Sequence, residues 1–292
     1  MEFAVSCVSG VLSCFVLALA YVGSLYLWTS KFSRNHPSTI KRRFFSVLLV
    51  TLAAPPYVWL WANNTDKGYS LWEWLGIRTA GIGAAAVLPL VLTMILFLGP
   101  IVMVFYDGIS SYFDLNLLKS EVSSSLWWRN YWVAPFTEEF VFRACMLPLL
   151  ISCLGFSKAV FICPLFFGVA HIHHVIERLR FQGRVLSNPS YMCQRIFFLH
   201  CISVFQFCYT TVFGAYTAFL FLRTGHLVAP VICHSFCNLM GFPAFGEISS
   251  YGQPRSSIIS IAFVAGLIAF IFLLFPMTSS SFFNNKVYAG FI

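Results

Sequence analysis

Long apolar runs recur from one end of this 292-residue chain to the other, and they constrain its fold more than any other feature. A run of about 18 or more residues with few charges can cross a bilayer as a helix. Because a backbone in lipid must satisfy its own hydrogen bonds, such spans fold as helices. The sequence therefore predicts an all-α polytopic membrane protein with 1–292 as a single domain. We place eight spans, at about 3–28, 44–62, 80–106, 130–154, 158–176, 196–222, 227–245 and 257–276.

The charged residues are few and lie mostly between the spans. They make up 10% of the chain, against about 25% for an ordinary soluble domain. The formal net charge is +8, but the basic residues fall in short loops. This placement favours contact with an anionic membrane surface and argues against a nucleic-acid partner.

The lysines and arginines outside the spans fall unevenly on the two sides of this arrangement. One side carries twelve, namely Lys31, Arg34, Lys41, Arg42, Arg43, Lys119, Arg129, Arg178, Arg180, Arg184, Arg195 and Arg255. The other side carries five, namely Lys67, Arg78, Lys158, Arg223 and Lys286. Because cytoplasmic loops carry the excess of positive charge, we expect loops 29–43 and 177–195 to be cytosolic and both termini lumenal.

Three patches place polar side chains inside the expected spans. They are the stretches TEEFVFR at 137–143, FGVAHIHH at 167–174 and HSFCN at 234–238. An ionisable group at membrane depth costs at least about 2.5 kcal/mol on insertion scales, and such groups usually mark functional sites. The patches are therefore the candidate site.

Helical spacing separates the roles of these residues. Glu139 and Arg143 stand at i and i+4, with the acid on the N-terminal side, which favours an ion pair. Glu138 is rotated from Glu139 by about 100° and remains available as a base. His234 and Asn238 are also at i and i+4, so both can face one cavity. A carboxylate suits water activation, and imidazole and amide donors suit an oxyanion hole.

Depth along the helices indicates that the patches meet. At 1.5 Å per residue from the cytosolic ends, Glu138 lies about 12 Å deep, His171 about 8 Å, Asn238 about 10 Å and His234 about 16 Å. Three helices therefore bring polar groups to the cytosolic half of the membrane. His173 and His174, considered alone, are better explained as packing or interfacial residues.

The patches resemble the signature of the type II CAAX prenyl proteases, the Ras-converting enzyme family, which carries EExxxR, FxxxH and HxxxN on separate helices of an eight-helix fold. The resemblance is strong over about 130–245, the expected catalytic helices, and weak over the first three helices. The context APFTEEFVFRACMLPLL resembles the eukaryotic members. The matching positions are Glu138, Glu139 and Arg143, then Phe167 and His171, then His234 and Asn238.

The resemblance implies an endopeptidase that removes the aaX tripeptide from farnesylated or geranylgeranylated CAAX proteins, such as small GTPases. It implies that Glu138 and His171 activate water, that His234 and Asn238 hold the oxyanion, and that Glu139 and Arg143 support the site. The prenyl chain would enter from the membrane lipid. The expected location is the endoplasmic reticulum membrane, with the catalytic cavity open to the cytosol.

Three rival functions are considered at this point. A zinc protease could use Glu138, His171 and His234 as ligands, but the chain has no HExxH motif, so we expect no metal and no other cofactor. A proton-coupled transporter or scaffold could also need buried carboxylates and histidines. However, the polar groups cluster at one depth and do not line a route across the membrane. A prokaryotic-type relative acting on other peptides fits the eukaryotic context less well.

The ten cysteines lie almost entirely in apolar stretches, without a CxxC pair. Free cysteines in such positions behave as small buried apolar residues. The sequence therefore gives no indication of a disulfide framework or a zinc knuckle.

Overall fold

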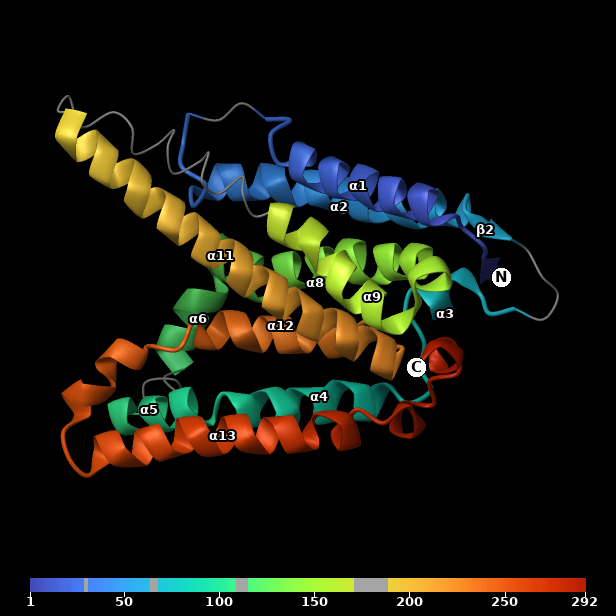
Figure 1. The fold of residues 1–292 in the computed structure, drawn as a ribbon. Helices are drawn as coiled ribbons and strands as arrows, with labels where there is room; N and C mark the ends of the chain where they lie inside the picture. The colour runs from blue at the N-terminus through green and yellow to red at the C-terminus, as the bar shows by residue number, and fades with distance from the viewer. Residues whose placement is uncertain (29–30, 64–67, 109–114, 171–188) are drawn as a thin grey trace.

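The computed structural model describes residues 1–28, 31–63, 68–108, 115–170 and 189–292, with the backbone alone at 115–118 and 189–202. The chain is a bundle of long helices with short connections (Figure 1). The longer helices are α1 (Cys7–Ser24), α2 (Pro37–Trp59), α4 (Ile82–Leu96), α5 (Leu98–Gly108), α9 (Met146–Ala170), α11 (Pro189–Thr224), α12 (Val228–Met240) and α13 (Arg255–Met277).

Shorter elements connect these helices and extend the fourth expected span. They are β1 (Glu2–Phe3), β2 (Ala62–Asn63), α3 (Leu71–Trp74), α6 (Leu115–Val122), α7 (Ser125–Trp128), η2 (Arg129–Val133), α8 (Ala134–Glu139), η3 (Phe140–Cys145), η4 (Phe245–Tyr251), η5 (Ser280–Phe283) and η6 (Ala289–Phe291). The β1 and β2 strands form a two-residue antiparallel ladder, a small addition to the expected all-α fold.

One end of the bundle gathers the two termini and the connection after α2 (Figure 1). The Met1 amino group donates to the Tyr69 carbonyl at 2.8 Å, and the Tyr69 hydroxyl donates to the Lys286 carbonyl at 3.0 Å. The Tyr288 hydroxyl donates to the Trp74 carbonyl. These segments were expected on one side of the membrane, and they do share one end.

Among the described residues, the opposite end brings together connections assigned to the other side. The Arg129 guanidinium donates to Asn35 Oδ1 at 2.9 Å, which joins the segment before α2 to the start of the fourth span. The Tyr251 hydroxyl donates to the Asp107 carboxylate at 2.8 Å, which joins the turn before α13 to the end of α5. These two contacts therefore place connections that were expected on one side of the membrane at one end of the bundle.

The membrane-spanning helices are recognisable by length and hydropathy. Among the described residues, four helices are long and apolar enough to cross a membrane, or up to six if each of two bent pairs counts as one span. One of the four is the helical stretch Ser125–Ala170. Its backbone leaves the helical conformation at Gly155, where φ is 71° and ψ is 176°. This break lies between the expected fourth and fifth spans.

Two expected spans are not continuous helices, which corrects their placement at 80–106 and 227–245. The chain bends by 76° between α4 and α5, and by 51° between α12 and η4. Pro100 lies in the first turn of α5, where it removes a backbone donor and disfavours continuation of α4. Gly241 ends α12 with φ 68°, a conformation that glycine adopts readily.

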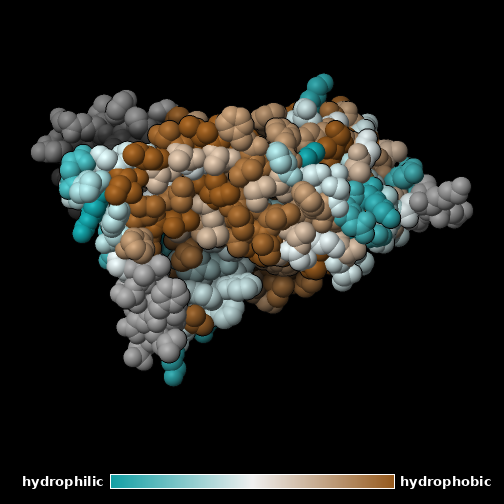
Figure 2. Space-filling view, turned by 90° about the horizontal axis from the view of Figure 1, so that it is seen from below, coloured by the Kyte–Doolittle hydropathy of each residue, from teal (hydrophilic) through white to brown (hydrophobic). Residues whose placement is uncertain are grey.

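A broad hydrophobic band covers the face that carries α4 and α13, with hydrophilic residues toward its ends (Figure 2). Large apolar side chains of α13 are exposed, including Phe272 at 75% and Ile261 at 66%. In water such a surface would be strongly unfavourable, whereas lipid tails cover it at little cost. The band therefore agrees with a multi-pass membrane protein.

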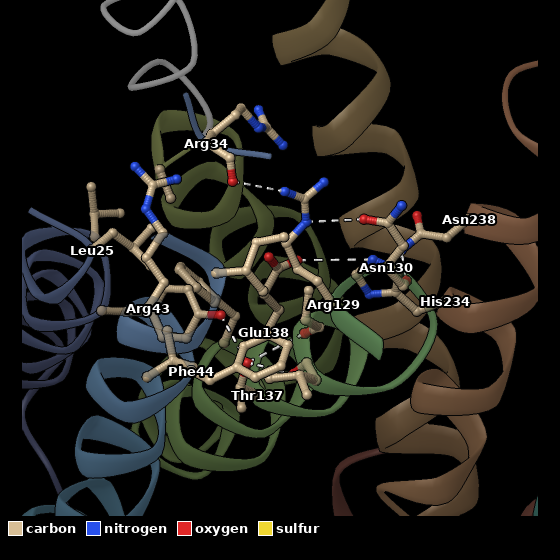
Figure 3. Close-up of a pocket in the computed structure, with 18 of the residues that line it drawn as sticks. Leu25, Arg34, Arg43, Phe44, Arg129, Asn130, Thr137, Glu138, His234 and Asn238 are labelled. Carbon is tan, nitrogen blue, oxygen red and sulfur yellow. Dashed lines mark hydrogen bonds and ion pairs between the residues drawn. The ribbon is translucent and has the colours of Figure 1, made fainter. Parts of the chain in front are cut away.

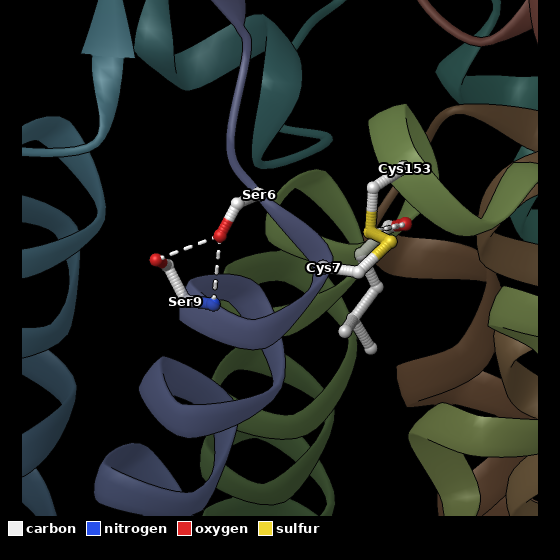
Figure 4. The surroundings of a disulfide bond; sticks show 5 residues. Ser6, Cys7, Ser9 and Cys153 are labelled. Carbon is white, nitrogen blue, oxygen red and sulfur yellow. Dashed lines mark hydrogen bonds between the residues drawn. A yellow bond between two sulfur atoms is a disulfide. The ribbon is translucent and has the colours of Figure 1, made fainter.

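A disulfide joins Cys7 at the start of α1 to Cys153 near the end of the fourth span, across 146 residues of sequence (Figure 4). The expectation of no disulfide was wrong for this pair. The two residues are far apart in sequence and sit in apolar stretches, so spacing gives no signal. The antiparallel packing of α1 on α9 brings their Cα atoms to 5.4 Å, within the ordinary range for a disulfide.

Candidate functional site

The two glutamates of the first patch lie on α8, a six-residue α-helix between two π-helical turns, η2 and η3. π-turns are rare and often occur at functional sites, because the extra residue rotates the following side chains. Here Glu139 and Arg143 still meet, with Oε1 and Nη1 at 3.1 Å and both side chains fully buried. The expected ion pair is therefore present.

His234 joins this pair from α12. Its Nδ1 lies 2.7 Å from Glu139 Oε1, and its Nε2 lies 3.8 Å from Glu138 Oε2. Because a carboxylate oxygen accepts hydrogen bonds, the imidazole donates from Nδ1, which fixes the orientation of the ring. The Nε2 atom is thereby presented to Glu138. The two adjacent glutamates thus contact opposite nitrogens of one histidine.

The Arg143 guanidinium is enclosed by apolar groups on its other sides. Its Cζ atom stands 4.2 Å above the centre of the Phe167 ring, a favourable cation–π arrangement. Gly214 on α11 permits this packing, since a Cβ atom there would lie 3.0 Å from Arg143 Nη2 and 2.9 Å from the Pro164 Cβ. The phenylalanine of the second patch therefore supports the ion pair, and Gly214 is a residue that the sequence analysis did not identify.

Glu138, His234 and Asn238 line one cavity of about 330 Å³ (Figure 3). Phe167 and Ala170 of α9 also line it. Glu138 is only 19% exposed, while Asn238 lies in the exposed part of α12. The cavity is therefore a partly enclosed chamber with a carboxylate on one wall and imidazole and amide groups on another.

The wall formed by His234 and Asn238 is attached to the wall formed by Glu138 through hydrogen bonds to the π-turn η2. Asn238 Nδ2 donates to the Asn130 carbonyl at 2.9 Å, and Ser235 Oγ donates to the Tyr131 carbonyl at 2.8 Å. In a π-turn some backbone carbonyls lack their usual hydrogen bond within the helix, so they can accept hydrogen bonds from a neighbouring helix. These bonds fix α12 against the helix that carries Glu138, and the Asn238 amide keeps a second N–H.

The structure therefore brings together five of the six predicted site residues. Glu138, His234 and Asn238 line the cavity, and Glu139 and Arg143 lie buried behind it. His171, with His173 and His174, lies outside the described residues. The sequence places His171 directly after Ala170, which lines the cavity.

Other residues of the cavity were not identified from the sequence as part of the site. The Tyr21 hydroxyl lies 2.9 Å from Thr137 Oγ1, which connects α1 to the turn before Glu138. Arg34, Arg43 and Arg129 also line the cavity. From the sequence, these arginines indicated only the orientation of the chain in the membrane. Arg34 lies within the loop 29–43, Arg43 is at its end and Arg129 is next to Asn130, and this placement was the available signal.

No group of three His, Cys, Asp or Glu side chains suitable for a metal occurs among the residues that the structure describes. The zinc hypothesis needs His171, which is outside that part of the chain. The hydrogen bond from His234 to Glu139 is also an arrangement common behind zinc-binding histidines.

Comparison with known proteins gives a consistent result. A family model described as Type II CAAX prenyl endopeptidase Rce1-like matches residues 121–240. The chain is 48% identical over 288 residues to CAAX prenyl protease 2 of Homo sapiens, which covers 96% of this chain and 84% of that protein. It is 33% identical over 302 residues to CAAX prenyl protease 2 of Arabidopsis thaliana, covering 94% and 91%. No solved structure matches.

Proposed function

This chain belongs to the type II CAAX prenyl endopeptidase Rce1-like family, and we propose that it removes the C-terminal aaX tripeptide from farnesylated or geranylgeranylated CAAX proteins. The observation that carries the proposal is the pair of Glu138 Oε2 and His234 Nε2, 3.8 Å apart in one cavity. A water molecule in the cavity beside this pair can lie within hydrogen-bond distance of both groups. A base beside a fixed imidazole is what peptide hydrolysis requires.

In this proposal Glu138 is the general base. It takes a proton from water as the water oxygen attacks the carbonyl carbon of the prenyl-cysteine, whose C–N bond to the next residue is the one to be cleaved. The tetrahedral intermediate then collapses, the C–N bond breaks, and the proton held by Glu138 passes to the leaving amine. The resemblance to the family motif implies that His171 assists Glu138. Glu139 and Arg143 are positioning residues, because Glu139 contacts His234, Arg143 contacts Glu139, and neither residue lines the cavity.

His234 and Asn238 stabilise the oxyanion. The Asn238 amide has an N–H beyond the one that it donates to Asn130. His234 can donate from Nε2 when its ring carries two protons, since Nδ1 is already committed to Glu139. Glu139 stabilises that charged ring by accepting from it. Donors fixed in advance are more effective than water, which must reorient.

We propose that the protein resides in the endoplasmic reticulum membrane and that its cavity opens to the cytosol. The Cys7–Cys153 disulfide supports this orientation, because disulfides persist in the oxidising lumen and are rare in the cytosol. Cys153 follows Glu138 by 15 residues, about 22 Å along a helix. The disulfide and the cavity are therefore at opposite ends of the fourth span. Prenylated small GTPases, made in the cytosol, fit this access.

The orientation predicts the outcome of a glycosylation test. An acceptor site on a flexible insert in the 177–195 loop should stay unmodified, and one inserted after Tyr288 should be glycosylated. The positive-inside bias and the disulfide both give this assignment. The readout is a glycosidase-sensitive mobility shift. Glycosylation within 177–195 would overturn the cytosolic access of the cavity.

The function itself is tested with the purified full-length chain and a farnesylated CAAX peptide. The expected product is the intact aaX tripeptide together with a peptide ending in farnesyl-cysteine, identified by mass spectrometry. The same peptide without its prenyl group is the control and should be cleaved poorly. Cleavage elsewhere in the peptide, or none at all by well-folded protein, would contradict the proposal.

A further inference from the structure

Asn130 lines the catalytic cavity at the start of the fourth span, eight residues before Glu138. Its backbone carbonyl accepts a hydrogen bond from Asn238 Nδ2 at 2.9 Å. Figure 3 shows the Asn130 side chain between the Arg129 guanidinium and Asn238, in the cavity that holds Glu138 and His234. The proposed mechanism gives the side-chain amide of Asn130 no role, so this amide is available for a contact with the substrate.

A hydrogen bond from Arg129 fixes the orientation of the Asn130 amide. Arg129 Nε donates to Asn130 Oδ1 at 3.1 Å. Because a guanidinium group can only donate, the amide oxygen must face it and the amide nitrogen must face away. Arg129 Nη1 donates in turn to Asn35 Oδ1 at 2.9 Å and to the Arg34 carbonyl at 3.3 Å. These bonds therefore hold the two N–H groups of the Asn130 amide in one direction.

The Asn130 amide nitrogen donates to no group among the residues that the structure describes. The residue is half-buried, so a ligand in the cavity can reach this nitrogen. A neutral amide donor matches a neutral acceptor such as a peptide carbonyl, and it loses less hydration than a charged group would. Because the direction of the amide is already fixed, binding costs little further conformational freedom. Asn130 is therefore suited to hold a carbonyl of a peptide backbone.

The part of the substrate that reaches Asn130 follows from where the substrate chain must lie. The chain upstream of the prenyl-cysteine connects to a folded protein, so it must leave through the mouth of the cavity. Asn130 lies nearer the mouth than Glu138, by at most about 12 Å for eight residues of helix. Three residues of extended peptide span about 10 Å. The carbonyl that reaches Asn130 therefore belongs to one of the three residues before the prenyl-cysteine.

We infer that the side-chain amide of Asn130 binds a backbone carbonyl in the three residues before the prenyl-cysteine, and thereby aligns the scissile bond with Glu138. The inference rests on the proposed function, since it concerns the recognition of the same substrate. This contact is present both before and during bond cleavage, so its loss should raise KM and leave kcat nearly unchanged. The effect differs from that of His234 and Asn238, which act on the oxyanion and therefore on kcat.

The test uses the full-length protein and farnesylated CAAX peptides in which one carbonyl oxygen at a time is replaced by sulfur. A thioamide sulfur accepts hydrogen bonds more weakly than an amide oxygen does. At one of the three upstream positions, the wild type should show a kcat/KM about 2- to 10-fold below that for the all-oxygen peptide, the size of one neutral hydrogen bond. In Asn130→Asp and Asn130→Ala this ratio should fall to about one, through a higher KM for the all-oxygen peptide.

Two features of the design separate a lost donor from a lost fold. Asn130→Asp keeps the acceptor for Arg129 and removes only the N–H groups. Each ratio is taken within one preparation, so partial misfolding of a variant cancels. Asn63→Ala is the matched control, because Asn63 is an exposed asparagine of β2 that does not line the cavity. Its ratio should stay at the wild-type value.

The inference would be overturned, while the proposed function stands, if the wild type cleaved the all-oxygen peptide and all three upstream thioamide peptides equally well. A ratio that is unchanged in both Asn130 variants, or an effect of sulfur confined to the aaX residues, would also overturn it. Cleavage of none of these peptides by folded wild type would contradict both the inference and the proposed function.

Discussion

Glu138→Gln should lower kcat for a farnesylated CAAX peptide by about 10²- to 10⁴-fold, the usual contribution of a general base. The amide keeps the shape of the carboxylate and can still hydrogen-bond to water, but it cannot take the proton. Glu138 lines the cavity and does not pair with Arg143 in the way that Glu139 does. Folding and membrane insertion should therefore be nearly unchanged. Steady-state kinetics on purified protein of matched thermal stability checks this.

The matched control for this variant is Glu121→Gln. Glu121 is an exposed carboxylate of α6, near the same end of the fourth span, and it does not line the cavity. Its removal should leave kcat close to the wild-type value. A well-folded Glu138→Gln protein with full activity would refute the proposed role of Glu138.

Arg143→Met should destabilise the protein by about 3–5 kcal/mol, because it leaves the Glu139 carboxylate buried without its cationic partner. Arg143 and Glu139 are both fully buried, and the guanidinium also packs on Phe167. The midpoint of thermal unfolding in detergent should fall by on the order of 10 °C. Arg42→Met removes an exposed charge from α2 and should cause little change.

The double variant Glu139→Gln with Arg143→Met distinguishes a buried ion pair from simple loss of packing. Replacing both charges removes the unpaired carboxylate, so much of the lost stability should return. Activity should not return with it, because a neutral amide in place of the Glu139 carboxylate no longer stabilises a charged His234 ring. If the single variant Arg143→Met unfolds at the wild-type temperature, the pair does not have the structural role assigned to it.

The hydropathy of the sequence was sufficient to predict the helical bundle, because long apolar runs have few other solutions in a membrane. The i, i+4 spacing was sufficient to predict the ion pair between Glu139 and Arg143. The bend between α4 and α5 was not predicted, although Pro100 was visible. Prolines also occur inside continuous helices of this chain, as Pro55 does in α2, so the residue alone does not locate a break. Tertiary packing decides which proline bends its helix.

The site shows the same limit. Helical spacing distinguished Glu139, which pairs within its own helix, from Glu138, which does not. It could not place His234, which is 95 residues away from Glu139. The contact of Glu139 with Nδ1 and of Glu138 with Nε2 depends on how α12 packs against α8. The π-turns η2 and η3 also have no sequence signature. Arg129 was predicted only as a loop charge. The direction of its side chain is set by these turns and by Asn35, and spacing along the sequence does not reveal it.

In the proposed mechanism a protein carboxylate, and not a bound metal, activates the water. Cleavage of the farnesylated peptide by wild-type protein should be measured before and after prolonged treatment with a strong chelator, with the metal content of each sample determined by elemental analysis. We predict an unchanged kcat/KM and no stoichiometric zinc. One zinc ion bound tightly per chain, lost together with activity on chelation and absent from His234→Ala, would contradict the account and make Glu138, His171 and His234 candidate metal ligands.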